Sequence, residues 1–94
     1  MKRYLLSYGE STGEYNLDYG CFNRNRKVLG KIGEDVLMKR LKAELVLHRE
    51  TIIYVQKNLE ASLKKPLLDC FKNTRIKINF EEKLESLCKD KAKI

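Results

Sequence analysis

The sequence has few of the residues from which catalytic and metal sites are usually built. It contains one histidine, His48, and three cysteines, Cys21, Cys70 and Cys88, without a Cys-x-x-Cys spacing. An odd number of cysteines without this spacing indicates neither a disulfide framework nor a zinc site. A lone histidine with no evident cysteine partner gives no nucleophile and base pair. We therefore expect no enzymatic activity, no metal and no cofactor, and we interpret the cysteines as reduced core thiols.

Long apolar runs and phosphate-binding glycine motifs are also absent. No stretch is long enough to span a bilayer, and no apolar run of signal-peptide length follows the basic N-terminus. Gly30 and Gly33 flank Ile32, which is not the spacing of a dinucleotide-binding loop. These absences predict a cytoplasmic protein that does not associate with membranes.

Positive charge, in contrast, is in excess. The 94 residues include 20 Lys and Arg against 13 Asp and Glu, which gives a net charge of +7. The excess is spread along the chain, so a basic patch can form only through folding. A chain of this length makes one domain with a modest core, and its charge favours polyanionic partners such as nucleic acid.

The N-terminal residues have the pattern of a β-hairpin. Two tyrosine-rich segments are separated by residues 9–13, where glycine, serine and threonine are typical of a turn. Tyr15, Leu17 and Tyr19 alternate with polar residues, as in a strand with one buried face. We predict a β-hairpin over residues 1–20. The tyrosines are interpreted as packing residues, with a stacking platform for nucleobases as the alternative.

The segment from Gly20 to Gly33 is rich in cations and asparagine. We predict a loop or an irregular strand here. Two interpretations stay open: a solvated connector, or a basic arm that contacts phosphates. The cations of this segment are Arg24, Arg26, Lys27 and Lys31.

The most strongly periodic stretch of the chain runs from Leu41 to Leu59. A helix is expected to begin at Gly33 to Asp35, because acidic residues favour the positive end of the helix dipole. If this helix continues, one apolar stripe recurs at spacings of four, three, four, three and four residues. The stripe consists of Leu41, Leu45, His48, Ile52, Val55 and Leu59.

The same stretch resembles the helix-turn-helix family of DNA-binding domains. LVLHRETIIY is similar in shape to the family's LGxSxxTVxR, and the resemblance is carried by Leu41, Leu45, Leu47, Thr51, Ile52 and Val55. It implies a positioning helix from Val36 to Leu45, a turn from Val46 to His48 and a recognition helix from Arg49 to Leu63. The side chains facing the major groove are then His48, Arg49, Glu50, Ile53, Tyr54 and Lys57.

The match departs from the family's pattern at two positions. Val46 stands where the family usually has glycine in the turn, and Lys42 stands where a small residue lets the helices approach. One continuous helix and a helix-turn-helix therefore both stay open for residues 34–65.

The remaining residues, 67–92, are predicted to form a helix, a strand and a helix. Pro66 is expected to end the central helix. A short helical patch then runs to Asn73, and the alternation in residues 74–79 predicts a half-buried strand that pairs with the N-terminal hairpin. Asn79 and Glu82 resemble a capping box at the start of a last helix.

Together these features predict an α+β fold: one small basic domain with an N-terminal β-hairpin, a long or broken central helix, a short strand and a C-terminal helix. We predict a regulatory protein that binds nucleic acid, DNA rather than RNA, and that forms a homodimer. The alternative is a non-enzymatic interaction module that forms oligomers, or docks on a larger assembly, through the Leu41 to Leu59 stripe. The residues predicted to contact nucleic acid are Arg24, Arg26, Lys27, Lys31, His48, Arg49, Tyr54 and Lys57.

Overall fold

A computed structural model describes residues 2–19, 25–45 and 49–82 of the chain. The described residues form five strands, two α-helices and one short 3-10 helix. In chain order these are β1 (Lys2–Gly9), β2 (Glu14–Tyr19), β3 (Asn25–Gly30), α1 (Glu34–Glu44), β4 (Thr51–Gln56), η1 (Lys57–Leu59), α2 (Glu60–Cys70) and β5 (Ile76–Glu81).

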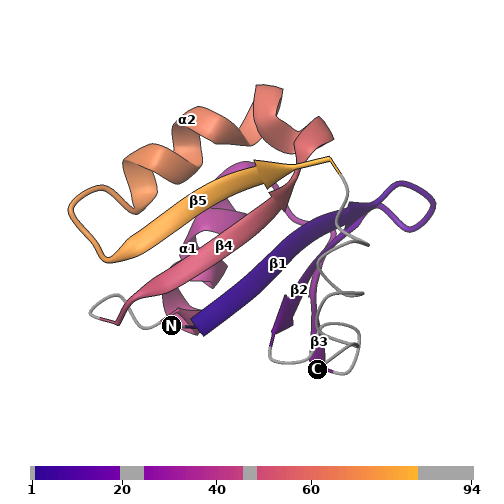
Figure 1. The fold of residues 1–94 in the computed structure, drawn as a ribbon. Helices are drawn as coiled ribbons and strands as arrows, with labels where there is room; N and C mark the ends of the chain where they lie inside the picture. Colours follow the sequence, from indigo (N-terminus) through magenta and orange to yellow (C-terminus); the bar gives the residue numbers. More distant parts are fainter. Residues whose placement is uncertain (1, 20–24, 46–48, 83–94) are drawn as a thin grey trace.

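The strands form one mixed sheet in the order β3-β2-β1-β4-β5 (Figure 1). The first three strands make an antiparallel meander with β2 in the middle. β4 then pairs in parallel with β1, and β5 pairs in parallel with β4. Parallel neighbours need a crossover connection, and α2 provides it between β4 and β5. As a result, β1, β4 and β5 all begin at the same end of the sheet.

Both helices cover the same face of the sheet, which we call the inner face (Figure 1). The helices contribute Leu37 and Leu41 from α1 and Leu63 and Leu67 from α2, and all four side chains are buried. They pack against strand residues of alternating positions, namely Tyr4, Leu6, Leu17, Ile53, Val55 and Ile76. The opposite face of the sheet, the outer face, carries Arg3, Leu5, Asp18, Arg26, Ile52, Tyr54, Lys77 and Asn79 by the same alternation.

Two local predictions are confirmed. β1 and β2 form the predicted hairpin, and in its turn the Gly13 N–H donates to the Gly9 carbonyl oxygen at 2.7 Å. Gly13 has φ of 73°, a conformation that glycine adopts without steric cost. α1 begins at Glu34, as expected from the acidic first turn.

The predicted long or broken central helix over residues 34–65 is wrong. α1 ends at Glu44, and Thr51–Gln56 is a strand in the middle of the parallel half of the sheet. The recognition helix implied from Arg49 to Leu63 is therefore not formed; strand β4, η1 and the start of α2 occupy these residues. The physical reason is that a run of β-branched and aromatic residues, with every second side chain buried, suits a pleated strand. The predicted turn at residues 46–48 lies outside the described residues.

The predicted apolar stripe is divided among separate elements. Leu41 belongs to α1, Val55 to β4 and Leu59 to η1, and none of these side chains is more than 7% exposed. They pack in the core of a single chain. An interface with a second chain would therefore have to use other residues.

Three further predictions need correction. Pro66 does not end a helix: it lies inside α2, which is held on the inner face by Leu63 and Leu67 on either side of the proline. The strand predicted at residues 74–79 is β5, and it pairs with β4 and not with the N-terminal hairpin. Asn79 lies within β5 and so cannot cap a helix. The rest of the predicted C-terminal helix lies outside the described residues.

The segment from Gly20 to Gly33, predicted as a loop or an irregular strand, contains a strand in its described part. β3 pairs with β2 from Asn25 to Gly30, with a register shift beside Tyr15 and Asn16. The polar residues of this segment left a loop as the alternative, because β3 lies at an edge of the sheet and, among residues 26–30, buries only Leu29 deeply.

Candidate nucleic-acid interface

The six predicted contact residues that the structure describes do not come together in one surface. Arg24 and His48 lie outside the described residues. Arg26 and Lys27 are on β3, and Lys31 is exposed just beyond its end. Lys57 begins η1, at the same end of the sheet as Lys31. Arg49 lies at the opposite end, before β4, and Tyr54 is on the outer face of β4.

Arg26 is held by a buried carboxylate. The register of β2 and β3 places it directly opposite Asp18 on the outer face. Its Nε and one terminal nitrogen donate to the two carboxylate oxygens of Asp18 at 2.7 and 3.0 Å. The Asp18 side chain is fully buried, while that of Arg26 is 49% exposed. Arg26 thus compensates an internal charge, and this role occupies its planar, two-pronged donor face.

Two more of the predicted cations are also paired. Lys27 points to the inner face, where its ammonium forms an ion pair with Glu44 near the end of α1. Lys57 pairs with Glu60 one helical turn later, at 2.9 Å. This hydrogen-bonded pair raises the pKa of Lys57 and lowers the pKa of Glu60. The predicted basic arm and the middle segment therefore have part of their charge neutralised.

A different group of cations gathers where the parallel strands begin. The first residues of the three strands are paired: Lys2 of β1 lies opposite Thr51 of β4, and Thr51 lies opposite Ile76 of β5. The Lys2 N–H donates to the Glu50 carbonyl oxygen at 3.1 Å, and the Thr51 N–H donates to the Arg75 carbonyl oxygen at 3.2 Å. These bonds join the three strand starts side by side. We call the exposed cations at this end the cationic edge: Lys2, Arg3, Arg49, Arg75 and Lys77.

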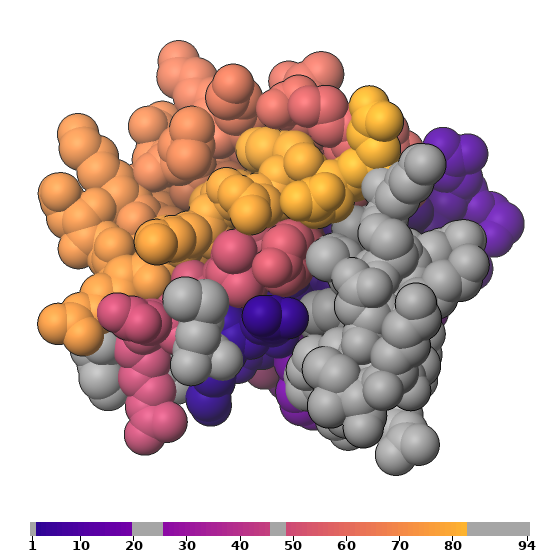
Figure 2. All heavy atoms as spheres, viewed as in Figure 1, coloured from indigo at the N-terminus to yellow at the C-terminus, as the bar shows by residue number. Residues whose placement is uncertain are grey.

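The cationic edge has little compensating charge. Within residues 2–19, 25–45 and 49–82, none of its five cations forms an ion pair. Glu50 is the acidic residue that the strand starts place among them, so the group carries a net charge of +4 out of the +7 of the whole chain. In Figure 2 the starts of β1, β4 and β5 lie together at the lower left of the molecule. Exposed cations without carboxylate partners are available to an anionic ligand.

A shallow hollow of about 220 Å³ lies between the starts of β4 and β5. It is lined by Glu50, Thr51, Thr74, Arg75 and Lys77. Two of the edge cations thus border a concave surface that also contains hydroxyl groups. The Thr51 and Thr74 hydroxyls donate to backbone carbonyl oxygens, at 3.2 and 2.6 Å, which fixes their orientation.

Sequence reasoning missed four of the five edge cations. In the sequence, Lys2 and Arg3 belong to the basic N-terminus, and Arg75 and Lys77 are polar positions of the strand predicted at residues 74–79. Their proximity depends on parallel pairing of strands that are distant in sequence. A local pattern does not contain this information; only a prediction of the sheet order could have joined them.

The five tyrosines of the chain are divided unequally between the faces of the sheet. Tyr4, Tyr8, Tyr15 and Tyr19 are on the inner face, where Tyr4 packs 6.1 Å from Tyr19 and Tyr8 packs 5.0 Å from Tyr15, measured between ring centroids. Burial is the main cause that raises the pKa of Tyr4 and of Tyr15. Their prediction as packing residues is confirmed for Tyr4, Tyr8 and Tyr15. Tyr54 is the one tyrosine on the outer face.

The described part of the chain contains one of the three cysteines, Cys70. Within this part, no group of three or more His, Cys, Asp or Glu side chains gathers to hold a metal ion. Cys70 packs partly buried against the core, 4.0 Å from the Met38 carbonyl oxygen, and burial raises the pKa of its thiol. A raised pKa leaves less of the nucleophilic thiolate. Cys21 and Cys88 lie outside the described residues. No helix among residues 2–19, 25–45 and 49–82 is long and apolar enough to cross a membrane.

Comparison of the chain with protein families, with characterised proteins and with solved structures finds no match. The functional inference therefore depends on the geometry and charge of the surface itself.

Proposed function

We propose that this protein binds nucleic acid, and that the cationic edge contacts the phosphate backbone. The observation that supports this proposal is the gathering of five exposed cations without ion-pair partners in the described structure, with one carboxylate among them. Each cation that contacts a phosphate releases a condensed counterion, which makes such a cluster an effective ligand for a polyanion.

The proposal differs from the sequence-based prediction in its location. Of the residues predicted from sequence, Arg49 belongs to the cationic edge, and Tyr54 lies on the adjoining outer face. Arg26, Lys27 and Lys57 are assigned to ion pairs instead. The backbone of the nucleic acid is expected to run across the starts of β1, β4 and β5.

Salt dependence gives a quantitative test. If all five edge cations contact phosphates, the logarithm of the affinity falls against the logarithm of salt concentration with a slope of about −3.5 for a single strand and about −4.5 for a duplex. We would measure this by fluorescence anisotropy with a labelled oligonucleotide, between about 50 and about 200 mM KCl.

Charge-matched variants test the location. The edge variant is Arg49→Gln, Arg75→Gln and Lys77→Gln; the control variant is Lys64→Gln, Lys65→Gln and Lys72→Gln, which removes three exposed cations from α2 and the turn after it. The edge variant is expected to lose at least about tenfold in affinity and to flatten the slope by about 2 to 3, because three phosphate contacts are gone. The control variant is expected to lose less than about threefold.

Two results would overturn the proposal. Equal losses in both variants would mean that the affinity reflects only total charge. Binding to vesicles that contain phosphatidylserine, without binding to any oligonucleotide, would assign the edge to a lipid surface instead.

A further inference from the structure

We propose that the nucleic acid is single-stranded and that one of its bases stacks on Tyr54, on the outer face beside the cationic edge. This inference rests on the proposed function and specifies the class of ligand. It is carried by the position of Tyr54 in the sheet and by the residues around it.

The register places Tyr54 between the edge cations and a polar neighbour. Arg3, Ile52 and Lys77 form one cross-strand row on the outer face, and Leu5, Tyr54 and Asn79 form the next row. Strand spacing and rise place the Tyr54 Cα about 8 Å from the Cα atoms of Arg3 and Lys77. The long side chains of both cations span this distance easily, so phosphates held there lie within one nucleotide of the ring.

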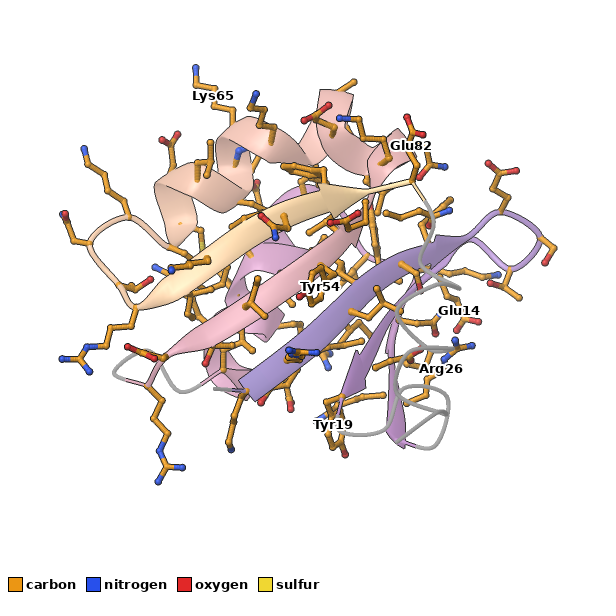
Figure 3. The ribbon with its side chains drawn as sticks, viewed as in Figure 1. Glu14, Tyr19, Arg26, Tyr54, Lys65 and Glu82 are labelled. Atoms are coloured by element: carbon orange, nitrogen blue, oxygen red, sulfur yellow. The ribbon has the colours of Figure 1, made fainter. Side chains whose placement is uncertain are left out.

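No described helix lies over the outer face at Tyr54, and the ring is partly exposed, whereas its row neighbour Leu5 is 4% exposed. Both helices are on the inner face, as Figure 1 shows, and Figure 3 labels Tyr54 on the central part of the sheet. Tyr54 and Ile52 are half-buried, and Asn79 is exposed. Within the described part of the chain, Tyr54 has no hydrogen bond and no contact with another aromatic ring. The inner-face tyrosines differ from it, because they pack against one another or against the core.

The shape of this surface favours an unpaired strand over a duplex. A duplex is usually read by a helix or a two-stranded ribbon that enters the major groove, which is about 12 Å wide. α1 and α2 are on the other side of the sheet, so neither can enter a groove from the outer face. A sheet face with an aromatic ring and flanking cations instead suits splayed bases, which stack on the ring while the backbone follows the cations. The exposed Asn79 amide beside the ring can donate to and accept from a base edge.

The chain contains no tryptophan, which allows a direct test of stacking. Tyr54→Trp introduces a single tryptophan at the proposed site, and a base that stacks on it quenches its emission. The ligands are an oligothymidylate of about 12 nucleotides, the same backbone with abasic residues, and a duplex of equal length. We expect quenching by the oligothymidylate and none by the abasic strand. Tyr19→Trp, at a 41% exposed position on the inner face, is the control and is expected to show no quenching.

Affinity measurements separate stacking from charge. Tyr54→Ala is expected to weaken oligothymidylate binding between about fivefold and about a hundredfold, and to leave binding of the abasic strand unchanged. Tyr54→Phe keeps the ring and is expected to stay within about threefold of the original protein. Circular dichroism checks that each variant is folded, and Tyr54→Phe and Tyr54→Trp preserve a ring should the alanine variant fail to fold.

The outcomes distinguish this inference from the proposed function. If the three ligands bind equally well per phosphate and the Tyr54 variants bind like the original protein, while the edge variant weakens all of them, the edge binds polyanions and the stacking inference is wrong. If no ligand binds at all, both proposals fail.

Discussion

Two regions of the sheet, strands β2 and β3 and the starts of β1, β4 and β5, differ in whether their cations form ion pairs. On the β2 and β3 side, Arg26 and Lys27 are each joined to a carboxylate from a neighbouring element, and one of these carboxylates is fully buried. At the starts of β1, β4 and β5, five exposed cations lie together with no ion pair in the described structure. The difference teaches that the strand register decides which cations stabilise the fold and which remain available to a ligand.

The largest expected effect is a loss of stability when Arg26 is substituted. Arg26→Ala leaves the buried Asp18 carboxylate without its two charged donors, so the free energy of unfolding is expected to fall by about 1 to 3 kcal/mol. The lower part of this range applies if water reaches the site, since Arg26 is 49% exposed. Urea unfolding followed by circular dichroism measures the change.

A double variant checks the cause. Asp18→Asn combined with Arg26→Ala removes the uncompensated charge, and it is expected to recover part of the lost stability. A double variant that is no more stable than Arg26→Ala would show that the arginine acts through its other contacts.

A smaller effect is expected on oligonucleotide binding. Here a cation of the cationic edge can be compared directly with a paired cation of β3. Arg75→Gln removes an unpaired edge cation and is expected to weaken oligonucleotide binding about threefold to about tenfold at low salt. Lys27→Gln removes the same charge from an existing ion pair and is expected to change the affinity less than about twofold. Fluorescence anisotropy at matched salt measures both, and a reversed order of the two effects would contradict the assignment of Arg75 to the interface.

The smallest expected effect is the pH dependence of the exposed Lys57 and Glu60 pair. The pKa of Glu60 is lowered from 4.5 in the folded protein, so its contribution to stability is present above that value and is lost as the pH falls through the lowered pKa. The pKa of Lys57 is raised from 10.5, so its contribution is present below that value and is lost as the pH rises through the raised pKa.

Thermal unfolding of Glu60→Gln measures this contribution. The variant is expected to have a slightly lower midpoint than the original protein at neutral pH, and the difference should disappear in acid, where Glu60 is protonated. A difference that is constant with pH would assign the effect to helix propensity instead of the ion pair.

The sequence predicted the parts of the fold that local chemistry decides. Turn residues between Gly9 and Gly13 predicted the hairpin, and the acidic first turn at Glu34 and Asp35 predicted the start of α1. The alternation around Ile76 and Ile78 predicted a strand, now β5. In each case the deciding residues are close together in the chain.

The central stretch could not be assigned by spacing alone. Leu41, Val55 and Leu59 fit a helical stripe and are indeed buried, but they reach the core from three different elements. The useful signal was the composition of residues 51–55, where β-branched and aromatic side chains favour a strand. The candidate interface depends on parallel pairing between β1, β4 and β5, which no local spacing records; Arg49 was therefore identified without the four cations beside it.

The pairing of β1 with β4 joins residues 2–6 to residues 51–55, and it is the contact between the N-terminal meander and the β4-α2-β5 unit within the sheet. Closing a loop of this length is entropically costly and slow compared with forming a hairpin. Lys2 and Arg3 belong to the N-terminal meander. The other cations of the edge, Arg49, Arg75 and Lys77, belong to the half that contains β4 and β5. A chain in which only one half has folded therefore presents an incomplete edge, so we expect the proposed binding of a polyanion to reach its full affinity only when the two halves have assembled.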